Sequence, residues 1–271
     1  MSRLLLLIPG FGEPHWDAKV AILRSNLQTV RGHSWDVDVI ICQYTPENER
    51  KLPDDLLNDS QISVKYGPGI VGQFIAQHAE PTPELVANYD LIMLLLDDVE
   101  LQPDTNWGKV VKWKEELNIN IISPSLTHDS KFIYRYMLRE TESNIHIKIT
   151  PVCEMFCYLA DMKSYAKWFS HLDAANNPWL WGMDLILTKH MGLRAGLLQM
   201  YSMRHHYQST CYDTATGFVT ADATASVPEP VARTHNASED FDKYITKFGE
   251  TRESLSQQPN TLYWVHVNGQ T

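Results

Sequence analysis

The apolar run from Leu91 to Leu96 restricts the fold of this chain more than any other feature. A membrane-spanning helix needs about 20 apolar residues, and this run is far shorter. A short, continuous apolar run is typical of a strand that is buried on both faces, as in the middle of a parallel sheet covered by helices. We therefore expect residues 90–96 to form the central strand of such a sheet.

Weaker strand and helix signals alternate along the rest of the chain. Strands or extended segments are expected at residues 4–8, 35–44, 62–65, 119–122, 145–149 and 152–159, and helices at 16–30, 70–78, 110–117, 162–171, 184–190 and 240–256. A turn is expected at residues 9–12. Strands separated by helices imply βαβ crossovers. The expected fold class is therefore α/β, a single Rossmann-related domain with a mostly parallel central sheet flanked by helices.

The composition changes after residue 213. Residues 214–238 are rich in Ala, Thr, Ser, Pro and Asp, which is typical of a long surface excursion. We expect residues 1–213 to form the domain. Residues 214–271 are expected to form an extension that packs on this domain or is partly irregular.

Charge and cysteine content exclude several classes of protein. The 271 residues include 23 basic and 33 acidic side chains, a formal net charge of −10. Proteins that follow a phosphate backbone are usually basic, so we expect no nucleic-acid partner. The four cysteines are too scattered for a disulfide framework, and no apolar run is long enough for a signal sequence or a membrane span. These features predict a cytoplasmic protein without a membrane span.

Three carboxylates follow the predicted central strand, in the sequence Asp97-Asp98-Val99-Glu100. Ligands of open parallel sheets bind beyond the carboxyl ends of the strands. Clustered carboxylates repel one another, and a divalent cation such as Mg²⁺ or Mn²⁺ relieves that repulsion. Asp98 and Glu100, two residues apart, point the same way on an extended chain. The cluster predicts a metal site, and an acidic turn without a ligand is the alternative.

Further candidate residues lie later in the chain. Trp181-Gly182-Met183-Asp184 places a carboxylate beside an indole, whose face stacks on sugar rings. Asp184 is a candidate base, and a helix N-cap is its alternative role. His205 and His206 follow an apolar stretch and are candidate metal ligands. Glu154 lies within an apolar segment, where an unpaired carboxylate is costly, so it is expected to meet a hydroxyl or a cation.

These motifs, in this order, resemble those of GT-A-fold glycosyltransferases. The chain is similar to a glycosyltransferase-like family widespread in plants, whose members combine an acidic motif, a Trp-Gly-x-Asp motif and a later His. It also resembles glycosyltransferases that large algal viruses use on their capsid glycans. The resemblance covers roughly residues 60–210 and is carried by the motifs. It implies a GT-A-like catalytic domain over residues 1–213.

The resemblance also implies a role for each candidate residue. It implies a metal ion, Mn²⁺ or Mg²⁺, held by Asp98, Glu100 and His205, with His206 in reserve. Glu at position 100 departs from the usual Asp and lengthens that ligand by one methylene. Asp184 matches the general base of inverting enzymes. The implied donor-binding residues are Pro9, Gly10, Tyr44, Lys65, Asp97 and Asp98, and the implied acceptor-binding residues are Glu154, Trp181 and Gly182.

The implied reaction is the transfer of a sugar from a nucleotide-sugar donor to a hydroxyl of a glycan or glycoprotein acceptor. A UDP-sugar is the default donor for this fold, and the viral enzymes suggest UDP-xylose. Two alternatives remain open. A sugar nucleotidyltransferase would use a similar sheet and metal, although it usually has basic residues after the glycines at positions 10 and 12. A carbohydrate-binding protein without turnover would also explain the eight Trp and twelve Tyr residues.

Overall fold

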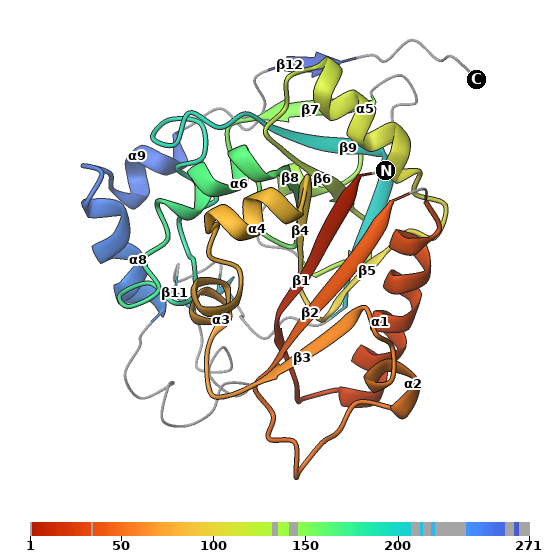
Figure 1. The fold of residues 1–271 in the computed structure, drawn as a ribbon. Helices are drawn as coiled ribbons and strands as arrows, with labels where there is room; N and C mark the ends of the chain where they lie inside the picture. Colours follow the sequence, from red (N-terminus) through yellow and green to blue (C-terminus); the bar gives the residue numbers. More distant parts are fainter. Residues whose placement is uncertain are drawn as a thin grey trace.

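The computed structural model describes residues 2–33, 35–131, 135–140, 146–206, 212–213, 218–219, 237–257 and 263–265. Within these ranges, ten strands form one sheet with the order β12-β7-β9-β6-β8-β4-β1-β2-β3, and β5 pairs with β9 beside this path. Helix α1 (Trp16–Arg31) packs on one side of the sheet, while α3 (Val71–His78), α4 (Pro83–Asn88) and α6 (Met162–Phe169) lie on the other (Figure 1). The α/β fold with flanking helices is confirmed.

The N-terminal half of the chain forms a parallel unit. Its strands are β1 (Arg3–Phe11), β2 (Asp36–Gln43), β3 (Ile62–Tyr66) and β4 (Leu91–Leu95), and each neighbouring pair is parallel. The short helix α2 (Asp54–Leu57) precedes β3. All five residues of β4 are buried, so the expected central strand is confirmed.

The second half of the sheet mixes both strand directions. β8 (Cys157–Asp161) lies antiparallel between β4 and β6 (Ile121–Leu126), and β6 is parallel to β9 (Ala195–His205). β7 (Ile147–Thr150) and β5 (Val99–Leu101) both pair antiparallel with β9. Helix α5 (Trp107–Glu116) and a 3-10 turn (Arg135–Met137) complete this half. The eleven-residue β9 pairs with β5, β6 and β7 and ends at the site described below.

Three expectations about local structure are wrong. Strand β1 continues through the expected turn at 9–12 as far as Phe11, with a register shift between Pro9 and Phe11. Residues 184–190 form successive turns instead of a helix, because three consecutive residues, 185–187, are buried and a one-faced surface helix cannot bury all of them. The expected helix at 240–256 is two helices, α8 (Ala237–Thr246) and α9 (Arg252–Ser256), separated at Gly249, whose φ is +72°.

The described parts of the C-terminal segment contact the rest of the protein. β12 (Tyr263–Val265) pairs with β7 of the main sheet. β10 (Tyr212–Asp213) and β11 (Phe218–Val219) pair with each other in a separate two-stranded sheet. In α8, Tyr244 is buried and donates a hydrogen bond to the His171 carbonyl at 3.0 Å. Most of the expected excursion at 214–238 lies outside the described residues, and the boundary at residue 213 stays a prediction. No helix in the described ranges has the length and apolar character needed to cross a membrane.

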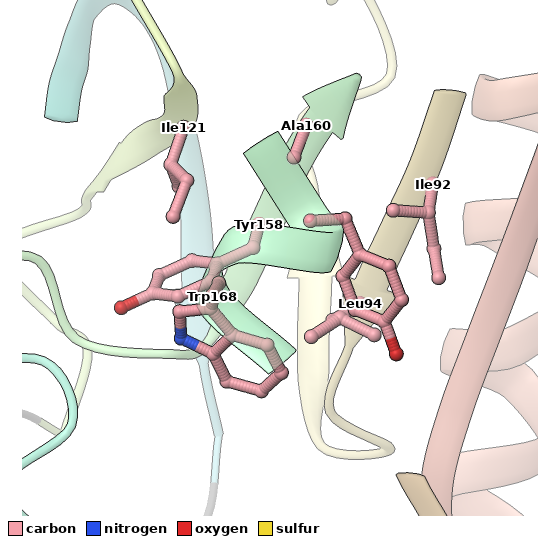
Figure 2. A pocket seen from close by; sticks show the side chains of 7 residues that line it. Ile92, Leu94, Ile121, Tyr158, Ala160 and Trp168 are labelled. Carbon is pink, nitrogen blue, oxygen red and sulfur yellow. The ribbon is translucent and has the colours of Figure 1, made fainter. Parts of the chain in front are cut away.

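A small void lies between α6 and strands β4, β6 and β8. Its volume is about 10 Å³, about the space that one water molecule needs. Figure 2 shows the side chains around it, which are mostly apolar or aromatic: Ile92, Leu94, Ile121, Tyr158, Ala160, Tyr165 and Trp168. This void is a feature of core packing and is too small for a substrate.

Candidate active site

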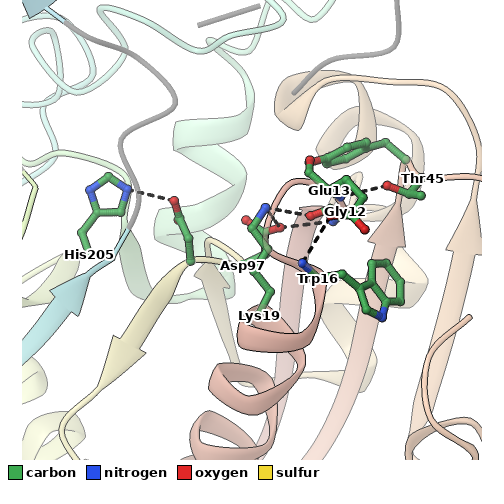
Figure 3. Close-up of polar contacts among 9 residues, drawn as sticks. Gly12, Glu13, Trp16, Lys19, Thr45, Asp97 and His205 are labelled. Carbon is green, nitrogen blue, oxygen red and sulfur yellow. Dashed lines mark hydrogen bonds and ion pairs between the residues drawn. The ribbon is translucent and has the colours of Figure 1, made fainter. Parts of the chain in front are cut away.

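The carboxyl ends of β1 and β4 meet at one edge of the sheet, where the loop after β1 contacts Asp97. The Asp97 Oδ2 atom accepts a hydrogen bond from the Gly12 amide at 3.2 Å and lies 2.8 Å from the Lys19 ammonium of α1. Lys19 also donates to the Gly12 carbonyl at 2.8 Å (Figure 3). Burial raises the pKa of Asp97 to about 6, although Lys19 opposes this shift. Lys19 thus ties the β1–α1 loop to the end of β4.

The same loop is attached to the end of β2. The Glu13 amide donates to Thr45 Oγ1 at 2.9 Å, and the Tyr44 hydroxyl donates to the Glu13 carbonyl. A Cβ atom at Gly12 would lie 2.5 Å from Thr45 Oγ1 and 2.6 Å from the Tyr44 ring, so only glycine fits there. Burial, followed by the charges of Asp97 and Asp98, raises the pKa of Tyr44. Tyr44 therefore faces the same acidic edge.

Asp98 and His205 form a buried pair between the ends of β4 and β9. His205 Nε2 lies 3.1 Å from Asp98 Oδ2, and the two residues are 9% and 8% exposed. His205 Nδ1 lies 2.7 Å from the Lys131 carbonyl, which only accepts, so Nδ1 carries a proton and Nε2 faces Asp98. Burial lowers the pKa of His205, but the charge and hydrogen bond of Asp98 outweigh burial and raise it.

A second pair lies beside the first. Glu100 Oε2 is 2.7 Å from His206 Nε2, and the His206 amide donates to the Asp98 carbonyl at 3.0 Å. The structure therefore places Asp98 with His205 and Glu100 with His206, and it does not gather Asp98, Glu100 and His205 around one point. Among the described residues, no three side chains of His, Cys, Asp or Glu lie close enough together to hold a metal ion.

The Asp98–His205 pair nevertheless fits one side of a divalent-cation site. Two ligands that bind an ion at right angles, at about 2.1 Å each, lie about 3.0 Å apart. The observed separation is 3.1 Å. The hydrogen bond from Nδ1 to a backbone carbonyl is also the usual means by which a ligating histidine is oriented. Mg²⁺ commonly has only one or two protein carboxylates as ligands and completes its shell with substrate phosphates and water.

Asp184 follows a turn with two residues of positive φ. Leu180 and Gly182 have φ values of +64° and +85°. Burial raises the pKa of Asp184 to about 7, and backbone hydrogen bonds at Gly182, Asp184 and Leu185 oppose that shift. A carboxyl group with a pKa near 7 is suited to accept a proton at neutral pH.

Glu154 connects the two parts of the site electrostatically. It is 6% exposed. After burial, the charges of both Asp184 and Glu154 raise the pKa of Tyr158, and the charge of Glu154 also contributes to raising that of His205. Glu154 is therefore close enough to influence both His205 and Tyr158, and Asp184 also influences Tyr158. Trp181 precedes Gly182 in the turn and is partly exposed, and its carbonyl accepts a hydrogen bond from Asn177 at 2.9 Å.

The remaining candidate residues lie along the parallel half of the sheet. Pro9 pairs with Cys42, and Gly10 has a φ of +119°. Lys65 is the penultimate residue of β3 and lies opposite Cys42. Burial, followed by the charge of Lys65, lowers the pKa of His78. Two strands separate β3 from β4, which places Lys65 on the order of 14 Å from Asp97. Lys19 was not among the predicted site residues, because nothing in the sequence indicates that this lysine of an amphipathic helix is buried.

No family model matches this sequence, and no curated protein sequence matches it. Among solved structures, GalNAc-T7 with UDP, GalNAc and Mn²⁺ is similar with a TM-score of 0.50 and 11% identity, over 76% of this chain and 43% of that one. S. aureus TarS 1-349 gives 0.48 and 8%, over 93% and 73%. A putative nucleotide-diphospho-sugar transferase from Desulfovibrio desulfuricans G20 gives 0.41 and 13%, over 73% and 80%.

At these identities the likeness concerns the fold. The chain has a GT-A-like α/β fold, in which a parallel unit of Rossmann type continues into a mixed sheet. Asp97 and Asp98 follow the carboxyl end of β4, which is the side where such sheets bind their ligands.

Proposed function

We propose that this protein is a metal-dependent glycosyltransferase. It transfers a sugar from a nucleotide-sugar donor, with UDP-sugars and in particular UDP-xylose as the first candidates, to a hydroxyl of a glycan or glycoprotein acceptor. The observation that carries the proposal is the buried Asp98–His205 pair, 3.1 Å apart at the end of the central strand, in a GT-A-like fold. The reaction also needs a general base, and the Asp184 carboxyl group, with a pKa of about 7, would supply it.

Asp98 and His205 would hold the metal ion, Mn²⁺ or Mg²⁺, together with the phosphates of the donor. Such an ion neutralises the charge that develops on the leaving diphosphate. Lys131 keeps the His205 ring oriented through its carbonyl, which accepts from Nδ1 at 2.7 Å. Glu100 is a further candidate ligand; reaching the same ion requires it to leave His206, its partner at 2.7 Å.

The donor would lie across the ends of β1, β2 and β3. Tyr44 and Lys65 would supply a hydroxyl and a cation there. Pro9 and Gly10, near the end of β1, would contact the donor from below the strand ends. Asp97 belongs to the same edge, where it accepts from Gly12. A phosphate group is attracted to the Lys65 ammonium, for which no ion pair is present among the described residues.

Asp184 would act as the general base that takes the proton from the acceptor hydroxyl as the hydroxyl attacks the sugar. Trp181 would offer its indole face to the acceptor sugar. Gly182, whose Cβ position is filled by Ile245 and Phe241 of α8, would contribute by shaping the turn that carries Trp181 and Asp184. Glu154 would accept a hydrogen bond from another acceptor hydroxyl. A single base on the acceptor side favours one displacement and therefore inversion at the anomeric carbon.

Binding of UDP, followed by a panel of UDP-sugars, tests this proposal by calorimetry with and without Mn²⁺. We expect Mn²⁺ to strengthen binding in the wild type, Asp98→Asn to abolish that strengthening, and His205→Ala to reduce it more than His206→Ala. Asp55→Asn is the matched control, because Asp55 is exposed and Arg24 is its only ion-pair partner within the described part of the chain. A wild type that binds neither UDP nor any UDP-sugar would refute the proposal.

Two other outcomes would support the alternatives. Formation of a nucleotide sugar from UTP and a sugar 1-phosphate would identify a nucleotidyltransferase. Glycan binding that needs no nucleotide and persists in Asp98→Asn would identify a carbohydrate-binding protein.

A further inference from the structure

Lys19 is a buried lysine whose contacts converge on the candidate donor site. It is 5% exposed and lies on α1 among the apolar residues that cover the sheet. Its ammonium lies 2.8 Å from Asp97 Oδ2 and 2.8 Å from the Gly12 carbonyl, and the Gly12 amide donates to the same Oδ2 at 3.2 Å. The backbone N–H and C=O of Gly12 are thus both held by one ion pair (Figure 3).

Helices that pack on a sheet usually do so through apolar side chains, and a buried ion pair in such an interface is unusual. Removing two charges from water costs several kcal/mol per ion, and apolar replacements of similar volume are often equally stable. The apolar residues Trp16, Val20, Leu23 and Leu27 already attach α1 to the core. The Lys19–Asp97 pair is therefore poorly explained by stability alone.

The ion pair fixes two things that the proposed reaction needs. First, it holds the Gly12–Glu13 segment, which also contacts Thr45 at 2.9 Å, across the ends of β1 and β2. Second, it neutralises Asp97, which directly precedes Asp98. Asp98 then contributes the negative charge that faces His205.

We propose that Lys19 is a positioning residue for the nucleotide diphosphate of the donor. It acts through Gly12 and Asp97 by fixing the β1–α1 loop and the start of the Asp98 segment at the spacing that the diphosphate and its cation require. This inference rests on the proposed function. Lys19 itself does not touch the donor, because its ammonium is already bound to Asp97 and Gly12.

A double-mutant cycle separates positioning from stability. The variants are Lys19→Met, Asp97→Asn and Lys19→Met/Asp97→Asn, with Lys19→Arg as the conservative replacement. Each single variant leaves one buried polar or charged group without its partner, so we expect both to lower Tm. The double variant removes both charges, and we expect it to recover most of the lost Tm.

Donor affinity is expected to behave differently from Tm. In the double variant, the KM for the UDP-sugar should still be raised about 10- to 100-fold, the range typical of residues that orient a ligand. The kcat at saturating donor should change much less. Lys19→Arg should restore part of the affinity, because it keeps the charge. In the double variant, the amides of residues 12 and 13 should also exchange their hydrogens faster than in the wild type.

The control is Arg24→Met, which breaks the exposed ion pair between the same helix and Asp55 and should change neither KM nor exchange at residues 12 and 13. If the double variant recovers KM together with Tm, Lys19 is structural and the inference is wrong. If the single variants do not fold, the double variant alone decides between these results. If the wild type binds no nucleotide sugar, the proposed function fails, and the inference fails with it.

Discussion

Asp97 and Asp184, two carboxylates of the proposed active site, both have raised pKa values but differ in their surroundings. Burial raises the pKa of Asp97 to about 6 and that of Asp184 to about 7. Asp97 is matched by the Lys19 ammonium at 2.8 Å. For Asp184, the described residues supply no cation, and only backbone hydrogen bonds counteract the rise in its pKa. A carboxylate next to a fixed cation is suited to hold a structure, whereas one without a cation is free to exchange a proton near neutral pH.

The two carboxylates also depend on different parts of the chain. The contacts of Asp97 come from β1 and α1, within the parallel half. The turn that carries Asp184 is covered by α8: a Cβ atom at Gly182 would lie 2.9 Å from both Ile245 and Phe241. The surroundings of Asp97 are therefore built within the first hundred residues, while the turn that carries Asp184 needs residues from the C-terminal segment.

The largest expected effect comes from Asp184→Asn. Removing a general base lowers the rate about 10²- to 10⁴-fold, so transfer should fall by that amount while binding of UDP with Mn²⁺ stays unchanged. Asp97→Asn should give the opposite pattern, with weakened donor binding and a smaller effect on kcat. Single-turnover rates and calorimetry on the two variants measure both quantities. Wild-type transfer by Asp184→Asn would show that another group is the base.

The pH dependence of the wild type should report the same carboxyl group. Deprotonated Asp184 is the active form, so kcat should rise with pH through about 7 and then level off. Below that range the rate should fall about tenfold per pH unit. A kcat that is independent of pH between 5 and 8, tested at fixed metal saturation, would exclude Asp184 as the base, provided that the chemical step limits the rate.

Stability should show the opposite trend at the same residue. Since folding raises the pKa of Asp184 from 3.8 to about 7, the folded protein binds this proton more tightly than the unfolded chain. Its contribution is fully present below 3.8 and is lost as the pH rises through about 7. Asp184→Asn should therefore gain stability relative to the wild type as the pH increases over this range.

The smallest expected effect is that of Gly182→Ala, which tests the dependence on α8. Gly182 has a φ of +85°, and a non-glycine residue in such a conformation costs about 1–3 kcal/mol. We expect Tm to fall by a few degrees and transfer to fall more than donor binding. Gly108→Ala is the control, because its Cβ atom would lie 3.4 Å from its nearest neighbour, Asn106 Oδ1. An equal loss of donor binding and transfer would show that the turn does not position Asp184 specifically.

The parallel half was predictable because its signals are local. The apolar run at 91–95 forms a buried strand whatever follows it, and Asp97 and Asp98 must then emerge at its carboxyl end. The turns at 184–190 were not predictable, since this segment contacts distant residues such as Glu250, whose carboxylate lies 2.6 Å from His190. A pattern within one segment cannot show which of its faces such neighbours will cover.

The sequence by itself determined the fold class, the central strand and the residue types that can bind a cation or exchange a proton. The tertiary structure decided which of them meet: Asp98 lies 107 positions from His205, and Lys19 is 2.8 Å from Asp97 although 78 positions separate them. Pairings of this kind depend on strand order and on the side of the sheet that each helix covers. The free energy of burying charge then acts on the assembled site, and it distinguishes a carboxylate with a cation, Asp97, from one without, Asp184.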